Sequence, residues 1–250
     1  MNADVARLTA RTLLGRRRTS LLLLLPLTLV ALCVLARMLA GLETGSNDGI
    51  DPALAADLIG AFGLATLLPL LGLIAGTGVI GPEIDDGSIV YLLSKPLSRH
   101  SIIVTKVTVA IGVVTVFGTV PIAVAGLVLT GELGGITAGY TVGALVAGIA
   151  YCAVFVLLGV ISRNAVVIGL IYALVWESLV GQVVPGARAL SIQQWGLALT
   201  ERIVGTDAET LRVASAVGLG TGVVLLAVVT AGCVWYAGHR LRTLRFTQES

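Results

Sequence analysis

The sequence predicts an all-α, polytopic membrane protein, on the basis of its composition, its charge distribution and the length of its apolar segments. The chain of 250 residues is 56% hydrophobic and 12% charged, about half the ~25% charged content of soluble domains. Its mean hydropathy is +1.00. Apolar tracts of about 20 residues, long enough to cross a bilayer as a helix, recur between clusters of charge. A soluble chain of this length could not enclose all of these tracts in one core.

Six apolar segments are expected to cross the membrane as helices of one transmembrane domain that covers residues 1–250. They lie at about residues 20–42, 58–80, 102–130, 136–161, 165–184 and 213–238. Pro69 is expected to kink the second span. Residues 1–19 alternate arginines with apolar residues and predict a short amphipathic N-terminal helix on the membrane surface. The apolar run after it lacks a small-x-small cleavage site, which favours an uncleaved first span over a signal peptide.

The distribution of lysine and arginine near the span ends predicts the orientation of the chain. Twelve of these residues fall on the side that holds the termini and three on the other side, with Arg37 near the outer end of the first span. The twelve are Arg7, Arg11, Arg16, Arg17, Arg18, Lys95, Arg99, Lys106, Arg163, Arg240, Arg242 and Arg245, and the three are Arg188, Arg202 and Arg212. Both the N- and C-termini are therefore expected in the cytoplasm. An even number of spans also requires both termini on one side.

The most polar internal segment lies between spans two and three, at residues 81–100, and reads GPEIDDGSIVYLLSKPLSRH. Proline and acidic residues at its start are typical of the first turn of a helix, and its isoleucines and leucines fit one apolar stripe. The pair Lys95-Pro96 ends that pattern, because the residue before a proline disfavours helical angles. The segment predicts a short cytoplasmic helix against the membrane or a partner protein, and composition alone leaves a plain connecting loop as the alternative.

This segment resembles the ATP-binding cassette (ABC) type-2 permease family, in which the corresponding stretch commonly reads E-x-x-x-G-T-L-x-x-L-L-x-x-P-x-S-R, with a lysine shortly afterwards. The matching residues are Glu83, Gly87, Leu92, Leu93, Pro96, Ser98, Arg99 and Lys106. Ser88 and Ile89 stand where Thr and Leu are usual. The six-span layout is similar to the same family, as is Trp176-Glu177 in the fifth span followed by Val184-Pro185-Gly186.

The resemblance implies the permease subunit of an ATP-driven ABC exporter in the plasma (cytoplasmic) membrane of a prokaryote. Such a permease pairs, here as a homodimer, and binds two copies of a cytoplasmic ABC ATPase subunit that holds ATP and Mg. The segment after span two would be the coupling helix that meets the ATPase, and the stretch between spans five and six would form short helices that dip at the outer face. The coupling residues so implied are Glu83, Asp85, Asp86, Gly87, Leu92, Leu93, Pro96 and Arg99. Apolar spans with few polar groups favour lipids or hydrophobic drugs as substrates.

The chain itself is not expected to be an enzyme or to bind a cofactor. A phosphate-binding loop needs Gly-Lys followed by Ser or Thr, and neither lysine of the chain, Lys95 or Lys106, follows a glycine. A net charge of +2 and the lack of a basic groove with interleaved aromatics exclude a nucleic-acid partner. Cys33, Cys152 and Cys233 each stand alone in an apolar tract, so they are interpreted as small hydrophobic residues and not as a disulfide or metal set.

Glu177 is the only acidic residue well inside a predicted span. It lies about 18 Å from the start of the fifth span at 1.5 Å per residue, at a depth where ionisable groups are costly and commonly functional. We treat it as a candidate pathway or gate residue, with a hydrogen bond to a neighbouring helix and snorkelling to the outer surface as structural alternatives. A proton-coupled secondary carrier that uses Glu177 is the alternative function. An intramembrane enzyme is less favoured, because His100 and His239 lie at span ends.

Glycine pairs at four-residue spacing occur in three of the predicted spans. They are Gly72/Gly76, Gly139/Gly143 and Gly218/Gly222. This spacing permits two helices to approach closely. Because the chain has 31 glycines, chance matches are expected, and the pairs are interpreted as generic packing.

Overall fold

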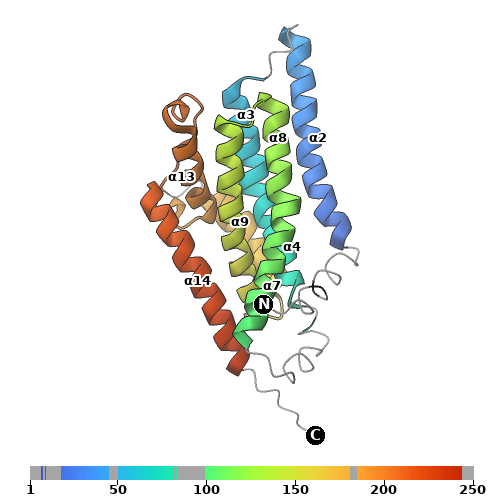
Figure 1. The fold of residues 1–250 in the computed structure, drawn as a ribbon, viewed down its shortest axis with the longest axis vertical. Coiled ribbons are helices and arrows are strands. Elements are labelled where there is room, and N and C mark those ends of the chain that lie inside the picture. Colours follow the sequence, from blue (N-terminus) through green and yellow to red (C-terminus); the bar gives the residue numbers. More distant parts are fainter. Residues whose placement is uncertain are drawn as a thin grey trace.

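The computed structural model describes Arg7, Thr9, Glu83 and residues 18–44, 50–81, 99–180 and 185–243. In this part of the chain the regular structure is entirely helical, without a β-strand. The long helices run side by side in an elongated bundle (Figure 1). The predicted all-α class is therefore confirmed. The short N-terminal helix predicted from residues 1–19 falls almost wholly outside the described residues.

Five helices of the described chain are long and apolar enough to cross a membrane. Four of them correspond to the first four predicted spans, and the fifth to the last. In chain order they are α2 (Arg18–Thr44), the continuous unit α3–η1–α4 (Pro52–Leu58, Ile59–Leu67, Leu68–Gly78), the continuous unit α7–η2–α8 (Arg99–Val114, Thr115–Thr119, Val120–Thr130), α9 (Gly135–Ile161) and α14 (Leu219–Thr243).

The fifth predicted span corresponds to a shorter apolar helix. It consists of α10 (Ala165–Ile171) and the π-helical segment η3 (Tyr172–Val180), with 7 and 9 residues. At 1.5 Å per residue these cover about 24 Å, less than the ~30 Å of a bilayer core. Residues 181–184, the end of that predicted span, lie outside the described part, so the count of six spans stays a prediction.

The stretch between η3 and α14 contains short helices that lie against the bundle. They are α12 (Pro185–Arg188), α13 (Ile192–Val204) and the 3₁₀ turn η4 (Gly205–Asp207). α13 lies beside the half of α9 that is farther from the start of α2 and the end of α14, while α14 runs along the other half (Figure 1). α14 begins at Leu219 and not at residue 213 as predicted, because the backbone N–H groups of Ser215 and Ala216 bind side chains of α13 instead of starting a helix.

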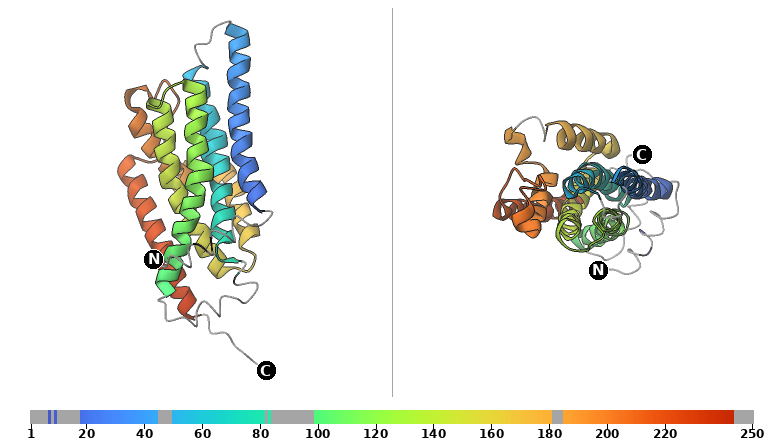
Figure 2. Two further views of the ribbon diagram at one scale, coloured as in Figure 1. Left: turned by 45° about the vertical axis from the view of Figure 1, so that its right-hand side comes forward. Right: turned by 90° about the horizontal axis from the view of Figure 1, so that it is seen from above.

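The centre of the bundle is formed by α4 and α9. The most apolar stretches of the spans that contain these helices are 61% buried, against 22% for α2 and 11% for α14. Gly72 and Gly76 of α4 face Tyr151 and Phe155 of α9, and a Cβ atom at Gly76 would lie 2.7 Å from the Cβ of Phe155. The end-on view in Figure 2 agrees with this arrangement, since α2 and α14 lie at its margins.

Two of the long helical units contain π-helical segments that end just before a proline. η1 precedes Pro69, in the first turn of α4, and η2 precedes Pro121, in the first turn of α8. A proline lacks the N–H group that would bond to the carbonyl four residues earlier, and its ring crowds that carbonyl. A widened π turn accommodates both effects without breaking the helix.

Candidate functional site

Buried charge in the described part of the chain is confined to two residues, Lys106 and Glu177, which are 0% and 1% exposed. Both lie in spans predicted from hydropathy. An uncompensated charge in such surroundings is very unfavourable, so each must be paired or hydrogen-bonded. The partners of these two residues therefore define the chemically distinctive places in the bundle.

Lys106 lies on α7 and joins that helix to the end of α4. Its Nζ atom donates a hydrogen bond to the carbonyl oxygen of Val79 at 2.5 Å and forms an ion pair with Glu83 Oε1 at 2.7 Å. The Val79 carbonyl stands at a helix C-terminus, where the last carbonyls lack partners within the helix and attract cations. The Glu83 side chain is 22% exposed, so the pair lies at the edge of the buried region.

The ion pair brings together the first acidic residue of the sequence motif, Glu83, and the lysine that follows it, Lys106. Arg99 begins α7, and its side chain is outside the described atoms. The other coupling residues implied by the motif are also outside the described residues: Asp85, Asp86, Gly87, Leu92, Leu93 and Pro96. The coupling helix itself thus stays a prediction. Its first acidic residue, Glu83, lies in direct contact with Lys106, the lysine that follows the motif.

Glu177 lies in η3 and binds the start of α13. Its Oε1 atom accepts hydrogen bonds from the Tyr172 hydroxyl at 3.0 Å and from the backbone N–H of Ile192 at 3.1 Å, and its Oε2 atom accepts one from the Ser191 hydroxyl. A carboxylate is favourable at a helix N-terminus, where N–H groups lack partners within the helix. With 1% exposure, this carboxylate does not reach the surface, which excludes the snorkelling alternative.

Aromatic residues of α9 enclose the same carboxylate. The buried Tyr151 hydroxyl interacts with Glu177, although it has no partner in hydrogen-bond geometry among the described residues. The Tyr151 and Phe155 rings stack at 6.1 Å, and Phe155 meets Tyr172 edge-on at 6.0 Å. Glu177 therefore joins η3 to α13 by hydrogen bonds, beside the aromatic residues of α9.

Close backbone contact holds α13 against α9. Thr200 donates a hydrogen bond to the carbonyl of Gly139 at 3.1 Å, and a Cβ atom at Gly143 would lie 2.7 Å from the carbonyl oxygen of Gly196. One of the predicted glycine pairs, Gly139/Gly143, is thus the docking surface for α13. This specific role was not predicted from the sequence, where the pair was interpreted as generic packing. The start of α13 does carry a sequence signal, because Ser191 stands before an apolar run.

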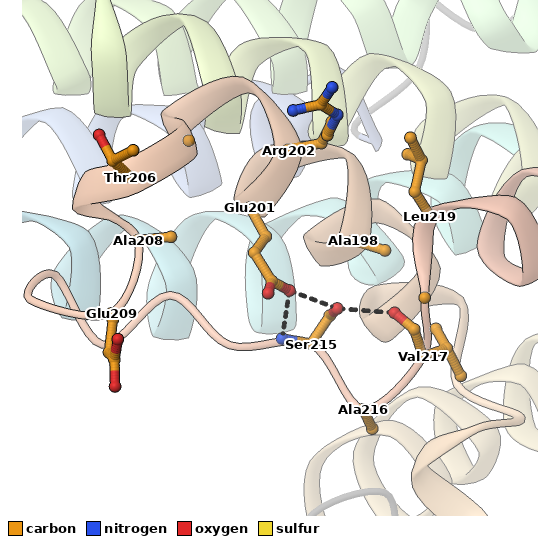
Figure 3. Close-up of a pocket in the computed structure, with 12 residues that line it drawn as sticks. Ala198, Glu201, Arg202, Thr206, Ala208, Glu209, Ser215, Ala216, Val217 and Leu219 are labelled. Carbon is orange, nitrogen blue, oxygen red and sulfur yellow. Dashed lines mark hydrogen bonds between the residues drawn. The ribbon is translucent and has the colours of Figure 1, made fainter.

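A hollow of about 710 Å³ lies between the end of α13, η4 and the turn into α14 (Figure 3). Glu201 Oε2 accepts hydrogen bonds from the backbone N–H of Ser215 at 2.9 Å and from its hydroxyl at 2.6 Å. Gln194 Oε1 accepts a hydrogen bond from the backbone N–H of Ala216 at 2.9 Å. These bonds fix the turn that precedes α14. Among the described residues, no group of three or more His, Cys, Asp or Glu side chains could hold a metal ion.

An apolar groove of about 680 Å³ opens along α14, between that helix, α9 and the start of α7. Small and branched apolar residues line most of it, and His100 and Trp235 lie toward the end at which α14 finishes. The His100 ring lies against Gly238, where a Cβ atom would overlap it. The groove offers an apolar surface at the side of the bundle.

These features define a polytopic integral membrane protein: long apolar helices, charges buried between them, and a short helix packed on the far half of the bundle. The family model for the ABC-2 family transporter protein matches residues 5–249, which is nearly the whole chain. The chain belongs to this family, as the motif around Glu83 predicted, and it is a membrane transport subunit of the kind that associates with an ABC ATPase. Comparison with curated proteins finds no match.

Proposed function

We propose that this chain is the permease of an ATP-driven ABC exporter and moves its substrate outward across the plasma membrane of a prokaryote. The observation that carries the proposal is the family match over residues 5–249, together with the buried ion pair at the start of the family motif. In this proposal two permeases form a homodimer, and two copies of a cytoplasmic ABC ATPase subunit bind ATP and Mg and close in each cycle.

The proposed topology has six spans, with both termini in the cytoplasm. The lysine and arginine distribution supports it, and so does the arrangement of the described helices, in which α13 lies on the half away from the start of α2 and the end of α14. Residues Glu83 to Arg99 then face the cytoplasm and form the coupling helix. ATPase closure would pass from this segment into α4 and α7, the helices that flank it.

Glu177 is the proposed gate residue on the outer half. Its hydrogen bonds to Ser191 and Ile192 hold α13 against η3, so movement of the fifth span would move α13 with it. In this role Glu177 acts through the position of α13 and has no need to touch the substrate. The apolar groove along α14 supports a lipid or a hydrophobic drug as the transported class.

The second candidate function is a proton-coupled secondary carrier. The observation that favours it is the burial of Glu177 beside two tyrosines, Tyr151 and Tyr172. Such a carrier would work with a proton gradient and without an ATPase partner. No further described acidic residue is buried near it, since the other acidic side chains are partly or fully exposed.

The test is affinity purification of the tagged chain from its native membranes in mild detergent, with mass spectrometry of the proteins that accompany it. An ABC ATPase in stoichiometric amount is the expected result. The variant Glu83→Ala/Asp85→Ala/Asp86→Ala should lose that ATPase. The matched control Asp207→Ala/Glu209→Ala, which changes exposed acids at the other end of the molecule, should retain it. Reproducible absence of an ATPase with the intact wild-type chain would favour the carrier.

A further inference from the structure

The ion pair between Lys106 and Glu83 occupies the point where two helices of the bundle converge. α4 ends at Gly78, and Val79 and Ile80 form the turn after it. Lys106 reaches this turn from α7 and binds both the Val79 carbonyl and the Glu83 carboxylate. One ammonium group therefore holds the last turn of α4 and the first acidic residue beyond it.

The end of α4 is also fixed against the centre of the bundle. A Cβ atom at Gly159 of α9 would lie 2.9 Å from Ile80 Cγ2, so this part of α9 leaves no free space beside Ile80. Ile80, three residues before Glu83, and Ile103, three residues before Lys106, are both fully buried. A displacement of Glu83 relative to α7 would therefore strain the contacts of α4 with α9 as well.

Complete burial of a lysine needs a reason beyond solubility or topology. An ammonium group loses its hydration on burial, and a buried ion pair often adds little to stability compared with apolar side chains of similar size. A lysine that served only the orientation of the chain would remain solvated at the membrane surface. Lys106 has 0% exposure and uses its donors on two different segments.

We propose that Lys106 is a positioning residue for energy coupling: it holds Glu83 and the end of α4 on α7, so that a displacement applied to the segment between Glu83 and Arg99 moves both helices together. This inference rests on the proposed function, since it assigns to Lys106 the step by which ATPase closure reaches the bundle. Without Lys106, no ammonium group would tie Glu83 and the Val79 carbonyl to α7, and the ATPase would still bind.

The experiment uses the permease with its co-purified ATPase, reconstituted in nanodiscs. Two spin labels report the outer end of the molecule, one at Leu42 on α2 and one at Thr206 on η4, both exposed; Cys33, Cys152 and Cys233 are first replaced by alanine. The distance between the labels is measured by double electron–electron resonance with and without ATP and vanadate. The variant Lys106→Met removes the ammonium group, keeps a side chain of similar length and leaves the residues assigned to ATPase coupling unchanged.

The wild-type complex is expected to change its label distance with ATP, and Lys106→Met to lose that change while keeping the ATPase at wild-type stoichiometry. A control pair on the outer face, Glu132→Met/Arg202→Met, should respond like the wild type. Should Lys106→Met fail to fold, Lys106→Gln keeps a hydrogen-bond donor for the Val79 carbonyl without the charge that pairs with Glu83, and is expected to reduce the distance change.

Two results separate the outcomes. An ATP response of wild-type size in the variants would overturn the positioning role and leave the ion pair a purely structural contact, with the exporter intact. Failure of the wild-type chain to bind any ABC ATPase would instead contradict the proposed function itself.

Discussion

At the scale of single residues, Glu177 illustrates how one carboxylate can join two elements, η3 and α13. Two of its three bonded donors, the Ser191 hydroxyl and the Ile192 N–H, are buried and would otherwise lack this partner, and the third, the Tyr172 hydroxyl, is half-buried. Buried donors left unpaired cost about 1–3 kcal/mol each. The stability of the contact between η3 and α13 therefore depends on the acceptor oxygens more than on the charge.

Replacement of Glu177 should consequently have different effects with different side chains. Glu177→Leu removes every acceptor, and we expect a loss of about 3 kcal/mol or more, measured as a lower midpoint of thermal unfolding in detergent. Glu177→Gln keeps one oxygen and should lose less than half as much. Glu209→Gln, a change at an exposed acid, is the matched control. Equal destabilisation by Leu and Gln would mean that the charge itself holds α13.

Sequence reasoning could identify Glu177, because an acid within an apolar tract is visible without a structure. It could not identify the donors. Ser191 and Ile192 come 14 and 15 residues later. Whether they reach Glu177 depends on how the chain folds back after residue 180. The same limit applies to Lys106, whose partners Val79 and Glu83 lie 27 and 23 residues earlier.

At the scale of helices, the contact between α9 and α13 depends on glycine at Gly143 and Gly196. The backbone carbonyl of Gly196 would lie 2.7 Å from a Cβ atom at Gly143, and a backbone atom cannot turn aside as a side chain can. The side of Gly112 on α7, by contrast, is open, with no atom within 4 Å of a Cβ there. Gly143 and Gly112 both lie within long helices, but only Gly143 has a backbone atom of another helix close beside it.

The substitutions Gly143→Ala and Gly112→Ala should therefore differ in sign. Gly143→Ala must push α13 away from α9 and is expected to destabilise the protein by about 1–3 kcal/mol. Gly112→Ala should be neutral or should stabilise it by about 0.4–1 kcal/mol, because alanine restricts the unfolded chain. Thermal unfolding in detergent gives both values, and hydrogen exchange over residues 192–204 locates the change. A Gly143→Ala protein as stable as the wild type would contradict the close packing.

Hydropathy predicted the long helices well. An apolar segment long enough to cross the bilayer must satisfy its backbone hydrogen bonds internally, and a helix does so. It could not predict the start of α14 at Leu219, because that boundary depends on Gln194 and Glu201 binding the preceding turn. The π-helical segments before Pro69 and Pro121 were likewise not predicted. A proline indicates an irregular turn, but the neighbouring helices decide its form.

At the scale of the whole molecule, the bundle has a buried centre and more exposed flanks. α4 and α9 make the centre, whereas most residues in the apolar stretches of α2 and α14 are exposed or half-buried. Arg37 of α2 donates a hydrogen bond to the Val128 carbonyl near the end of α8, so α2 is attached through a polar contact at its outer part. Exposed apolar flanks are suited to lipid or to a second copy of the chain.

The proposed orientation predicts which end of this bundle faces the outside. In a chain whose three cysteines are replaced by alanine, Thr206→Cys should react with a membrane-impermeant maleimide added to intact cells. His239→Cys, near the end of α14, should react only after the membrane is permeabilised. Both positions are exposed, so accessibility within the protein is matched. The reverse pattern would place the termini outside and would remove the coupling segment from the cytoplasm.

The separation of Glu177 from its donors along the chain also has a consequence for biosynthesis. A nascent chain emerges N-terminus first, so Glu83 is already synthesised when Lys106 enters the membrane and can pair with it. Glu177 emerges with Tyr172, but before Ser191 and Ile192. Until α13 arrives, its carboxylate lacks two of its three bonded donors, at a depth where an acid opposes insertion by about 2.5–3.5 kcal/mol. The full hydrogen bonding of Glu177 is therefore reached only when α13 folds back onto η3, which makes this contact a late step of assembly.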